Sequence, residues 1–279
     1  MTAAAHLHDP QELYRRWEHE QWNPWSIDLA IDGEQWQNAL SSKDKSLVYW
    51  ALSSLMVAEE RITTKFAGLV MAAESEEEAS YLASQQVDEA RHMQFYARFQ
   101  NDVIAEPAAI AAHVARSRDQ LGESFSVIFD QALVSAHERL VDEPADRGAK
   151  VEFVTTYHLV IEATLGLTAF EFITRYLNSN RLLPGFVDGY NHIHHDEQRH
   201  IGYGVWFLRQ TASQDAAMAE RVRAKLTELL PAVATALAPA DSEDTDWEAL
   251  GVTGDEVRRC ALEGLTRRLN VIGVPLTNE

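Results

Sequence analysis

The sequence is poor in the residues that build covalent cross-links or thiolate sites. Its 279 residues contain a single cysteine, Cys260. One cysteine forms no disulfide within a chain, and it excludes metal sites that need several thiolates. Uncharged apolar runs of transmembrane length are also lacking, so we expect no membrane span. The N-terminus has neither the basic start nor the apolar stretch of a secretory signal, and we expect a cytoplasmic protein.

Basic charge and strand-like patterning are scarce as well. Lys and Arg number 24 against 43 Asp and Glu, which gives a formal net charge of −19. This balance argues against nucleic acid as a partner, because phosphate binding needs a basic surface. Strict alternation of apolar and polar residues is absent, and the 13 glycines and 8 prolines fall mostly between stretches of helical periodicity. We therefore predict an all-α fold.

The periodicity predicts helices along nearly the whole chain. The predicted ranges are 10–21, 43–73, 76–103, 107–118, 121–142, 147–179, 184–210, 215–237 and 247–269. Asn23-Pro24 and Asp32-Gly33 punctuate an extended lead, and Ser42 or Asp44 is a candidate cap for the second helix. The acidic segment 238–246 reads as a linker. We predict one bundle over 1–237, with a linker and a further helix over 238–279, either loosely attached or packed on the bundle.

Two Glu-x-x-His pairs stand out in this helical background. They are Glu89 with His92 and Glu197 with His200. Residues three apart share a helix face, so each pair can aim one carboxylate oxygen and one imidazole nitrogen at one point. Either pair alone would also fit a surface contact. Two pairs on neighbouring helices, with one Glu from each of two more helices, form the ligand set of ferritin-like dinuclear centres. Such a set suits iron or manganese and leaves room for dioxygen.

Two further carboxylates occupy apolar helix faces. Glu59 falls on the apolar stripe of the predicted helix 43–73, whereas Glu60 falls beside it. A charge on such a stripe is costly unless it is paired or bound to metal, so Glu59 is the ligand candidate. Glu162 lies in the most apolar part of the helix 147–179, and Glu171 is a weaker substitute for it. A buried Glu that is only hydrogen-bonded remains the alternative for Glu162.

Several segments resemble a known superfamily. WNPWSIDL, AEERI, DEARHMQFYARF, TYHLVIEATLG and DEQRHIGYGVWFL are similar to the ribonucleotide reductase small subunits, and most similar to their ligand-binding oxidase branch. The resemblance runs from about residue 10 to about residue 210. It implies a ferritin-like bundle, a homodimer, dioxygen as co-substrate and an Fe/Fe or Mn/Fe centre. The implied ligands are Glu59, Glu89, His92, Glu162, Glu197 and His200.

The oxidase branch implies further roles. Its members place a Val three residues after the first ligand Glu and a Tyr five residues before the third, and oxygen activation joins the two by an ether bond. Here these positions are Ile62 and Tyr157, and Ile keeps the tertiary Cβ of Val. On an ideal α-helix Tyr157 lies about 140° from Glu162, so this role requires a helical bulge. The branch also implies an apolar ligand, such as a long-chain fatty acid. No electron donor is indicated by the sequence.

A reductase small subunit is the main alternative. By resemblance, Trp22, Asp196 and His92 form the path of electrons to the metals, and Tyr96 stands where reductase subunits carry a tyrosyl radical. Against this, no tyrosine follows Tyr203 to act as the last carrier towards a catalytic subunit. A ferritin-like storage or detoxification protein is the third alternative, and it predicts a large shell instead of a dimer.

Overall fold

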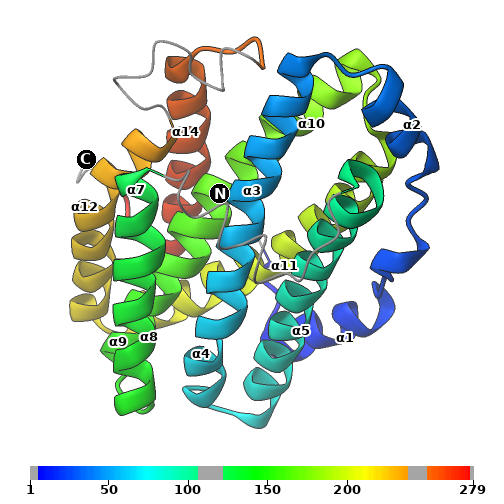
Figure 1. Ribbon diagram of the computed structural model, residues 1–279. Coiled ribbons are helices and arrows are strands. Elements are labelled where there is room, and N and C mark those ends of the chain that lie inside the picture. The colour runs from blue at the N-terminus through cyan, green and yellow to red at the C-terminus, as the bar shows by residue number, and fades with distance from the viewer. Residues whose placement is uncertain (1–5, 106–121, 238–249, 277–279) are drawn as a thin grey trace.

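The computed structural model describes residues 6–105, 122–237 and 250–276, and every element within these ranges is a helix (Figure 1). The elements are α1 (Pro10–His19), η1 (Pro24–Ser26), α2 (Ala30–Asn38), α3 (Ser42–Lys65), α4 (Ala67–Met71), α5 (Glu76–Phe99), η2 (Gln100–Ile104), α7 (Glu123–Phe125), η3 (Ser126–Ala132), α8 (Leu133–Asp142), α9 (Arg147–Val154), η4 (Thr155–Gly166), α10 (Leu167–Asn180), α11 (Pro184–Gln214), α12 (Ala216–Leu237) and α14 (Gly254–Ile272). The predicted all-α fold is confirmed. The predicted helix 107–118 lies outside the described residues.

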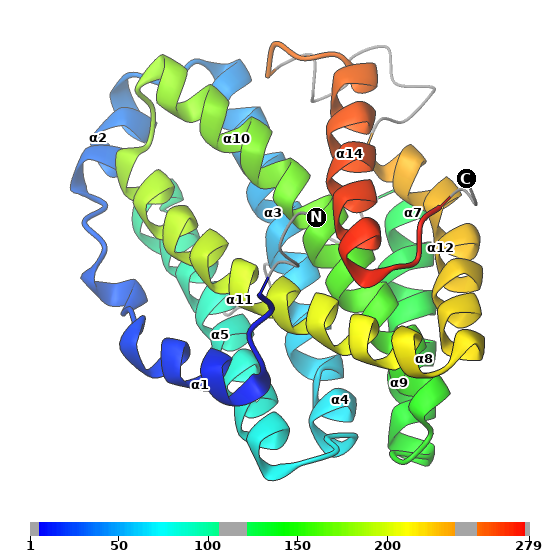
Figure 2. The ribbon, with the colours of Figure 1, turned by 180° about the vertical axis from the view of Figure 1, so that it is seen from behind.

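Four long helical segments form the centre of the bundle. α3 packs against α5, and α11 packs against both α5 and η4. Figure 2 shows α11 crossing the back of the molecule, with α1 and α2 on one side of the bundle and α8 and α12 on the other. A single hydrophobic core runs through these elements. The ferritin-like bundle with additional packed helices is therefore confirmed, and its interior is where the candidate ligands project.

Side-chain caps define where the helices begin. Ser41 caps α3, and Asp44 at the third helical position closes a reciprocal capping box with it. The cap thus lies one residue before the predicted Ser42. Ser75 caps α5 by accepting a hydrogen bond from the backbone N–H of Glu78. The predicted helix 43–73 is divided at Phe66, after which the short α4 begins.

One helix was missed by the sequence prediction. Asp32 and Gly33, interpreted as punctuation of an extended lead, lie inside α2. Asp32 is fully buried, and its carboxylate accepts hydrogen bonds from the backbone N–H groups of Gly185 (2.8 Å) and Phe186 (2.7 Å). It therefore caps the N-terminus of α11 from a distant part of the chain, which satisfies donors that the helix cannot satisfy itself.

The third core segment is one continuous helix with a change of winding. The predicted helix 147–179 is α9, η4 and α10 in sequence, and η4 is π-helical over twelve residues. The stretch Arg147–Asn180 is long and apolar enough to cross a membrane by length and composition alone, but 72% of its most apolar window is buried inside the structure. Its apolar character is that of a core helix.

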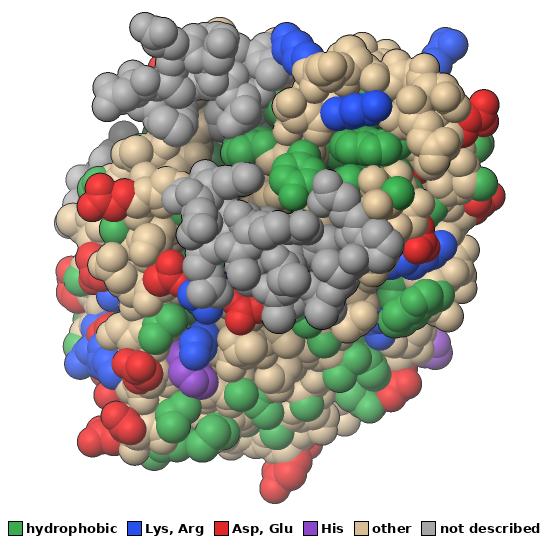
Figure 3. All heavy atoms as spheres, viewed as in Figure 1, with side chains coloured by type: hydrophobic (Ala, Val, Ile, Leu, Met, Phe, Trp, Pro, Cys, Tyr) green, Lys and Arg blue, Asp and Glu red, His purple; other side chains and the backbone are tan. Residues whose placement is uncertain are grey.

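The C-terminal helix packs on the bundle. α14 begins at a Thr253 cap and buries one face, which includes Leu265 and Leu269, against α11 and η4. It starts later than the predicted 247–269, and the predicted linker 238–246 lies outside the described residues. On the surface shown in Figure 3, acidic side chains are spread among basic ones instead of gathering in one patch.

Candidate metal centre

The structure brings all six proposed ligands together inside the bundle. Each core segment supplies its share: α3 one Glu, α5 a Glu-x-x-His pair, η4 one Glu and α11 the second pair. Helical geometry explains the convergence within each pair, because residues three apart lie on the same face. All these side chains are buried except that of Glu197, which is 16% exposed.

The donors fall into two overlapping groups. In each group one donor atom of every residue lies within 4.8 Å of the others. The groups are Glu59, Glu89, His92 and Glu197, and Glu89, Glu162, Glu197 and His200. Glu89 and Glu197 belong to both groups, so these two carboxylates would be shared by two metal ions. The arrangement is that of a dinuclear site with one terminal Glu and one His for each metal.

The imidazoles face the carboxylates through Nδ1. His92 Nδ1 lies 3.6 Å from Glu59 Oε1 and 3.4 Å from Glu89 Oε2. His200 Nδ1 lies 3.1 Å from Glu89 Oε1 and 3.3 Å from Glu162 Oε1. These donor atoms therefore all face one common space inside the bundle.

Buried atoms without partners fit a pair of cations. The following ligand atoms are buried and have no hydrogen-bond partner in residues 6–105, 122–237 and 250–276: Glu59 Oε2, Glu89 Oε2, Glu162 Oε2, His92 Nδ1 and His200 Nδ1. Leaving buried polar atoms unsatisfied is costly, and buried carboxylates are normally paired or bound to metal. Two divalent cations would satisfy these atoms and balance the four carboxylate charges. The donor set of nitrogens and hard oxygens suits iron and manganese.

Burial and mutual repulsion shift the protonation of this cluster. Burial raises the pKa of Glu59 and of Glu162 to about 7, although a neighbouring imidazole opposes the shift in each case. Burial, with the nearby charges of Glu162 and Glu89, also raises the pKa of Glu197 well above its ordinary value. Burial acts on Glu89 too, but the two imidazoles hold its pKa well below the usual range. Without metal, part of the cluster therefore retains protons near neutral pH.

Each histidine is held by an aspartate from the opposite motif. His92 Nε2 lies 3.1 Å from Asp196 Oδ2, and His200 Nε2 lies 3.2 Å from Asp88 Oδ2. A carboxylate accepts the Nε2–H, which leaves Nδ1 free to bind metal. The resemblance indicated Asp196 for His92, but the role of Asp88 was not predicted. The signal was present, because Asp precedes Glu in both Asp-Glu-x-Arg-His motifs.

A buried arginine and two tryptophans complete this outer layer. Arg199, 1% exposed, donates to Asp196 Oδ1 at 2.5 Å and to Asp88 Oδ2 at 3.2 Å. Trp22 Nε1 donates to Asp196 Oδ2 at 2.8 Å, as the resemblance implied. Trp17 Nε1 donates to Asp88 Oδ1 at 2.9 Å, which gives the second aspartate an equivalent partner. Burial opposes ionisation, but His92 and Arg199 hold the pKa of Asp196 well below its usual value.

Tyr157 lies at the centre because η4 is wound as a π-helix. Its hydroxyl donates a hydrogen bond to Glu89 Oε1, and Gln85 Nε2 approaches that hydroxyl at 3.3 Å. The required bulge is thus present, and it spans both Tyr157 and Glu162. Ile62 is buried on α3 one turn after Glu59, and Phe66 one turn further on contacts the Tyr157 ring at 5.1 Å.

Tyr96 is buried in aromatic surroundings. It lies one turn after His92 on α5, and its ring is 5.8 Å from Phe95 and 6.4 Å from Tyr190. Its hydroxyl has no hydrogen-bond partner within the described part of the chain. Burial raises the pKa of Tyr96 well above its ordinary value. Among the described residues, no base accepts a hydrogen bond from it.

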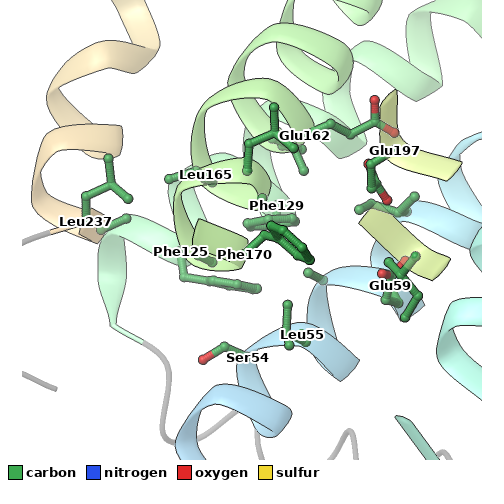
Figure 4. Close-up of a pocket in the computed structure, with 18 of the residues that line it drawn as sticks. Ser54, Leu55, Glu59, Phe125, Phe129, Glu162, Leu165, Phe170, Glu197 and Leu237 are labelled. Carbon is green, nitrogen blue, oxygen red and sulfur yellow. The ribbon is translucent and has the colours of Figure 1, made fainter. Parts of the chain in front are cut away.

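An apolar cavity of about 380 Å³ opens beside the carboxylates. Glu59, Glu162 and Glu197 lie in its wall, together with Ile62 and Tyr96. Figure 4 shows the three carboxylates at one end, Phe129 and Phe170 in the middle, and Leu237 at the far end. The volume lies in the range of small-molecule sites. A molecule in this cavity would touch the metal ligands directly.

Comparisons with known proteins agree with this geometry. The family model described as the small chain of ribonucleotide reductase matches residues 4–234. A tyrosine-to-phenylalanine mutant of an R2-like ligand-binding oxidase with an aerobically reconstituted Mn/Fe cofactor superposes with a TM-score of 0.81 at 21% identity, over 95% of this chain and 93% of that chain. A valine-to-isoleucine mutant with an anaerobically reconstituted Mn/Fe cofactor gives 0.82 at 22% identity, over 97% and 94%. These likenesses show the same fold, and the buried Glu and His cluster suits a dinuclear cofactor of that kind.

Proposed function

The chain belongs to the ribonucleotide reductase small-chain family, and we propose that within it the protein is a dioxygen-activating oxidase that acts on an apolar ligand. Membership in this family supports oxidoreductase chemistry. The observation that carries the narrower proposal is the apolar cavity, because its wall contains three of the metal-binding carboxylates. A protein that bound no substrate at its metal centre would have no use for an open apolar space beside the metal-binding carboxylates.

The cavity favours an elongated apolar ligand with a polar head. Its carboxylate end offers the two metal positions to an anionic group, and the rest of its wall is aliphatic and aromatic (Figure 4). Burying the tail there is favourable because apolar surface leaves water. A long-chain fatty acid, with its carboxylate at the metals and its tail towards Leu237, has this chemistry.

The protein residues prepare the site for that reaction. When bound, the two metal ions supply the reduction of dioxygen and the oxidising power that follows. The four glutamates would balance the positive charge of these ions. Asp88 and Asp196 fix the orientation of the two imidazoles. Tyr157 donates its phenolic proton in a hydrogen bond to Glu89, which holds the ring beside the metal-binding carboxylates.

The chemical class of the ligand can be tested by identifying the molecule that co-purifies with the protein. We expect organic extraction and mass spectrometry to recover one class of fatty acid at close to one molecule per chain. Ala169 lines the cavity, so Ala169→Leu should fill it and reduce the recovered ligand at least about fivefold, because overpacking costs on the order of 1–3 kcal/mol. Ala212 is also partly buried but lies outside the cavity wall, so Ala212→Leu is the matched control. Equal ligand in both variants would contradict the proposal.

A reductase small subunit is the second candidate. The chain from Trp22 through Asp196 to His92 favours it, since hydrogen bonds link an indole to a metal ligand. The unpartnered hydroxyl of Tyr96 argues against a tyrosyl radical there, because an oxidised phenol must lose its proton to a nearby base. A stable radical that disappears in Tyr96→Phe, together with nucleotide reduction on addition of a large subunit, would establish this second function instead.

A further inference from the structure

A second buried polar cluster lies outside the metal centre. Tyr203 of α11 is fully buried, and its hydroxyl donates to Glu78 Oε1 at 2.6 Å. Glu78 is 4% exposed, and Lys150 Nζ lies 2.9 Å from both of its carboxylate oxygens. Lys150 is itself 1% exposed. A buried phenol, carboxylate and ammonium joined in this way are costly to assemble, and they take no part in holding metal.

Aromatic rings connect this cluster with the metal centre and with the surface. Tyr157, whose hydroxyl donates to Glu89, has its ring 4.6 Å from that of His158. The His158 ring lies 5.3 Å from that of Tyr203, and the Tyr203 ring lies 6.0 Å from that of Trp206. Trp206 is only partly buried. Tyr203 thus stands between the tyrosine at the metals and an indole that reaches solvent.

A glycine brings the two helices close enough for these ring contacts. A Cβ at Gly204 would lie 2.3 Å from His158 Cβ, a distance that real atoms do not adopt. Only glycine allows α11 to approach η4 at this point, which places His158 against the residue that precedes Gly204. The spacing of the rings is therefore built into the backbone.

The hydrogen bond to Glu78 distinguishes Tyr203 from the other buried tyrosines near the centre. Removing an electron from a phenol makes it a strong acid, so oxidation is easy only where a base already accepts its proton. Tyr96 and Tyr81 are both fully buried, and neither hydroxyl has a hydrogen-bond partner among the described residues. Tyr157 has Glu89, but that carboxylate is a metal ligand. Tyr203 combines burial with a carboxylate that is not a metal ligand, and Lys150 holds that carboxylate in place.

We propose that Tyr203 is a redox-active tyrosine. Once dioxygen has oxidised the metal pair, Tyr203 gives one electron to that pair and its phenolic proton to Glu78. The electron passes along the His158 and Tyr157 contacts, and the metal pair is reduced by one electron. A thiol or ascorbate-type reductant at Trp206 then returns one electron to Tyr203, and the proton moves back from Glu78. This path removes oxidising equivalents when no ligand occupies the cavity. The proposal rests on the proposed function, which supplies the oxidant.

Freeze-quench electron paramagnetic resonance on the metal-loaded protein tests this role. After the reduced protein is mixed with dioxygen, we expect a tyrosyl radical that falls at least tenfold in Tyr203→Phe. Tyr81→Phe is the matched control, since its ring lies 5.7 Å from that of Tyr203 and its hydroxyl has no partner. That variant and Tyr96→Phe should keep the signal. Glu78→Gln should weaken it about tenfold while the metals are still oxidised, and Trp206→Phe should slow its decay on addition of ascorbate.

Iron oxidation, followed in the same samples by Mössbauer spectroscopy, separates the two proposals. Oxidised metals without a radical on Tyr203 would overturn the redox role and leave the oxidase proposal standing. If the metals are not oxidised at all, the oxidase proposal fails, and a light-generated ruthenium(III) oxidant then replaces dioxygen. With that oxidant a radical lost in Tyr203→Phe would support the redox role, and a radical unchanged in that variant would overturn it.

Discussion

Asp88 on α5 lies with its Oδ2 3.2 Å from Nε2 of His200 on α11, so the aspartate of one motif holds the histidine of the other. The reverse contact, from His92 to Asp196, has nearly the same length. Arg199 joins the two aspartates and is itself buried. Hydrogen bonds among Asp88, Asp196 and Arg199 and the two histidines therefore hold α5 and α11 together independently of any metal. This arrangement makes both imidazoles rigid before any metal binds.

Removing either aspartate should weaken metal binding. We expect Asp88→Asn and Asp196→Asn each to lower metal affinity about 10–100-fold, because an amide holds the imidazole less firmly and makes it less basic. Asp102, exposed on η2, provides the control Asp102→Asn. Competition against a chelator of known affinity measures the change. An effect of Asp196→Asn alone would show that the crosswise pairing is not functionally symmetrical.

The adjacent pair Glu59 and Glu60 gives a sharp test of the ligand set. Glu59 is 6% exposed and faces His92, whereas Glu60 accepts a hydrogen bond from Arg61 at 3.2 Å. Elemental analysis should find close to two metals per chain in Glu60→Gln and at least one fewer in Glu59→Gln. The circular dichroism of both variants should remain helical. Two metals retained in Glu59→Gln would remove this residue from the site.

Much of the centre could be predicted from local sequence. The Glu-x-x-His spacing and the apolar stripe of helix 43–73 show which side of each helix faces inward. Ligands on the inward faces of neighbouring helices then meet in the interior of the bundle. The partner of His200 was missed because the spacing rule relates residues of one helix only. Asp88 lies on α5 and contacts His200 on α11. The helix α2 was missed for a similar reason. Asp32-Gly33 has the local chemistry of a turn, and the buried cap that Asp32 makes on α11 is visible only in three dimensions.

The π-helical winding of η4 could be predicted only in part. An ideal helix would have turned Tyr157 away from Glu162, and the resemblance alone argued for a bulge. No proline, the residue that most often distorts a helix, is present in this segment to indicate one. The bulge reflects packing and the hydrogen bond from Tyr157 to Glu89.

Tyr157 and Ile62 should become covalently joined on aerobic metal loading. The phenolic O–H and the Cβ–H bond of Ile62 would break and an O–Cβ bond would form, with the two protons released to water and the two electrons taken up by the oxidised centre. We expect the intact mass to fall by the mass of two hydrogen atoms and the two tryptic peptides to migrate as one species. Tyr157→Phe, which keeps the ring, should abolish the change. An unaltered mass in the wild type after complete metal oxidation would contradict this chemistry.

The metal-free protein should lose stability as pH rises. Glu59 and Glu162 bind protons with a pKa of about 7 in the folded state, above the ordinary value of 4.5. A carboxyl with a raised pKa binds protons more strongly when folded, so stability falls as pH rises between the two values. The imidazoles of His92 and His200, whose pKa is also raised, extend the loss above pH about 7. Thermal unfolding with a chelator should show Tm falling by several degrees between about pH 5 and about pH 8.

A matched pair of variants separates this effect from the general acidity of the chain. Glu162→Gln should flatten the pH dependence, because it removes one buried proton-binding group. Glu171→Gln on the exposed side of α10 should leave it unchanged. Saturation with manganese and iron should also flatten it, since the metals replace the protons. A metal-free protein that becomes more stable with rising pH would contradict the assigned pKa shifts.

A crystal structure of the metal-loaded protein with anomalous data at the iron and manganese edges tests the central claim most directly. We predict two peaks inside the bundle. One should be bound by Glu59 and His92, the other by Glu162 and His200, and both by the bridging Glu89 and Glu197. A single peak there, or metal only at the exposed group His6, His8 and Glu12, would contradict a dinuclear centre in this protein.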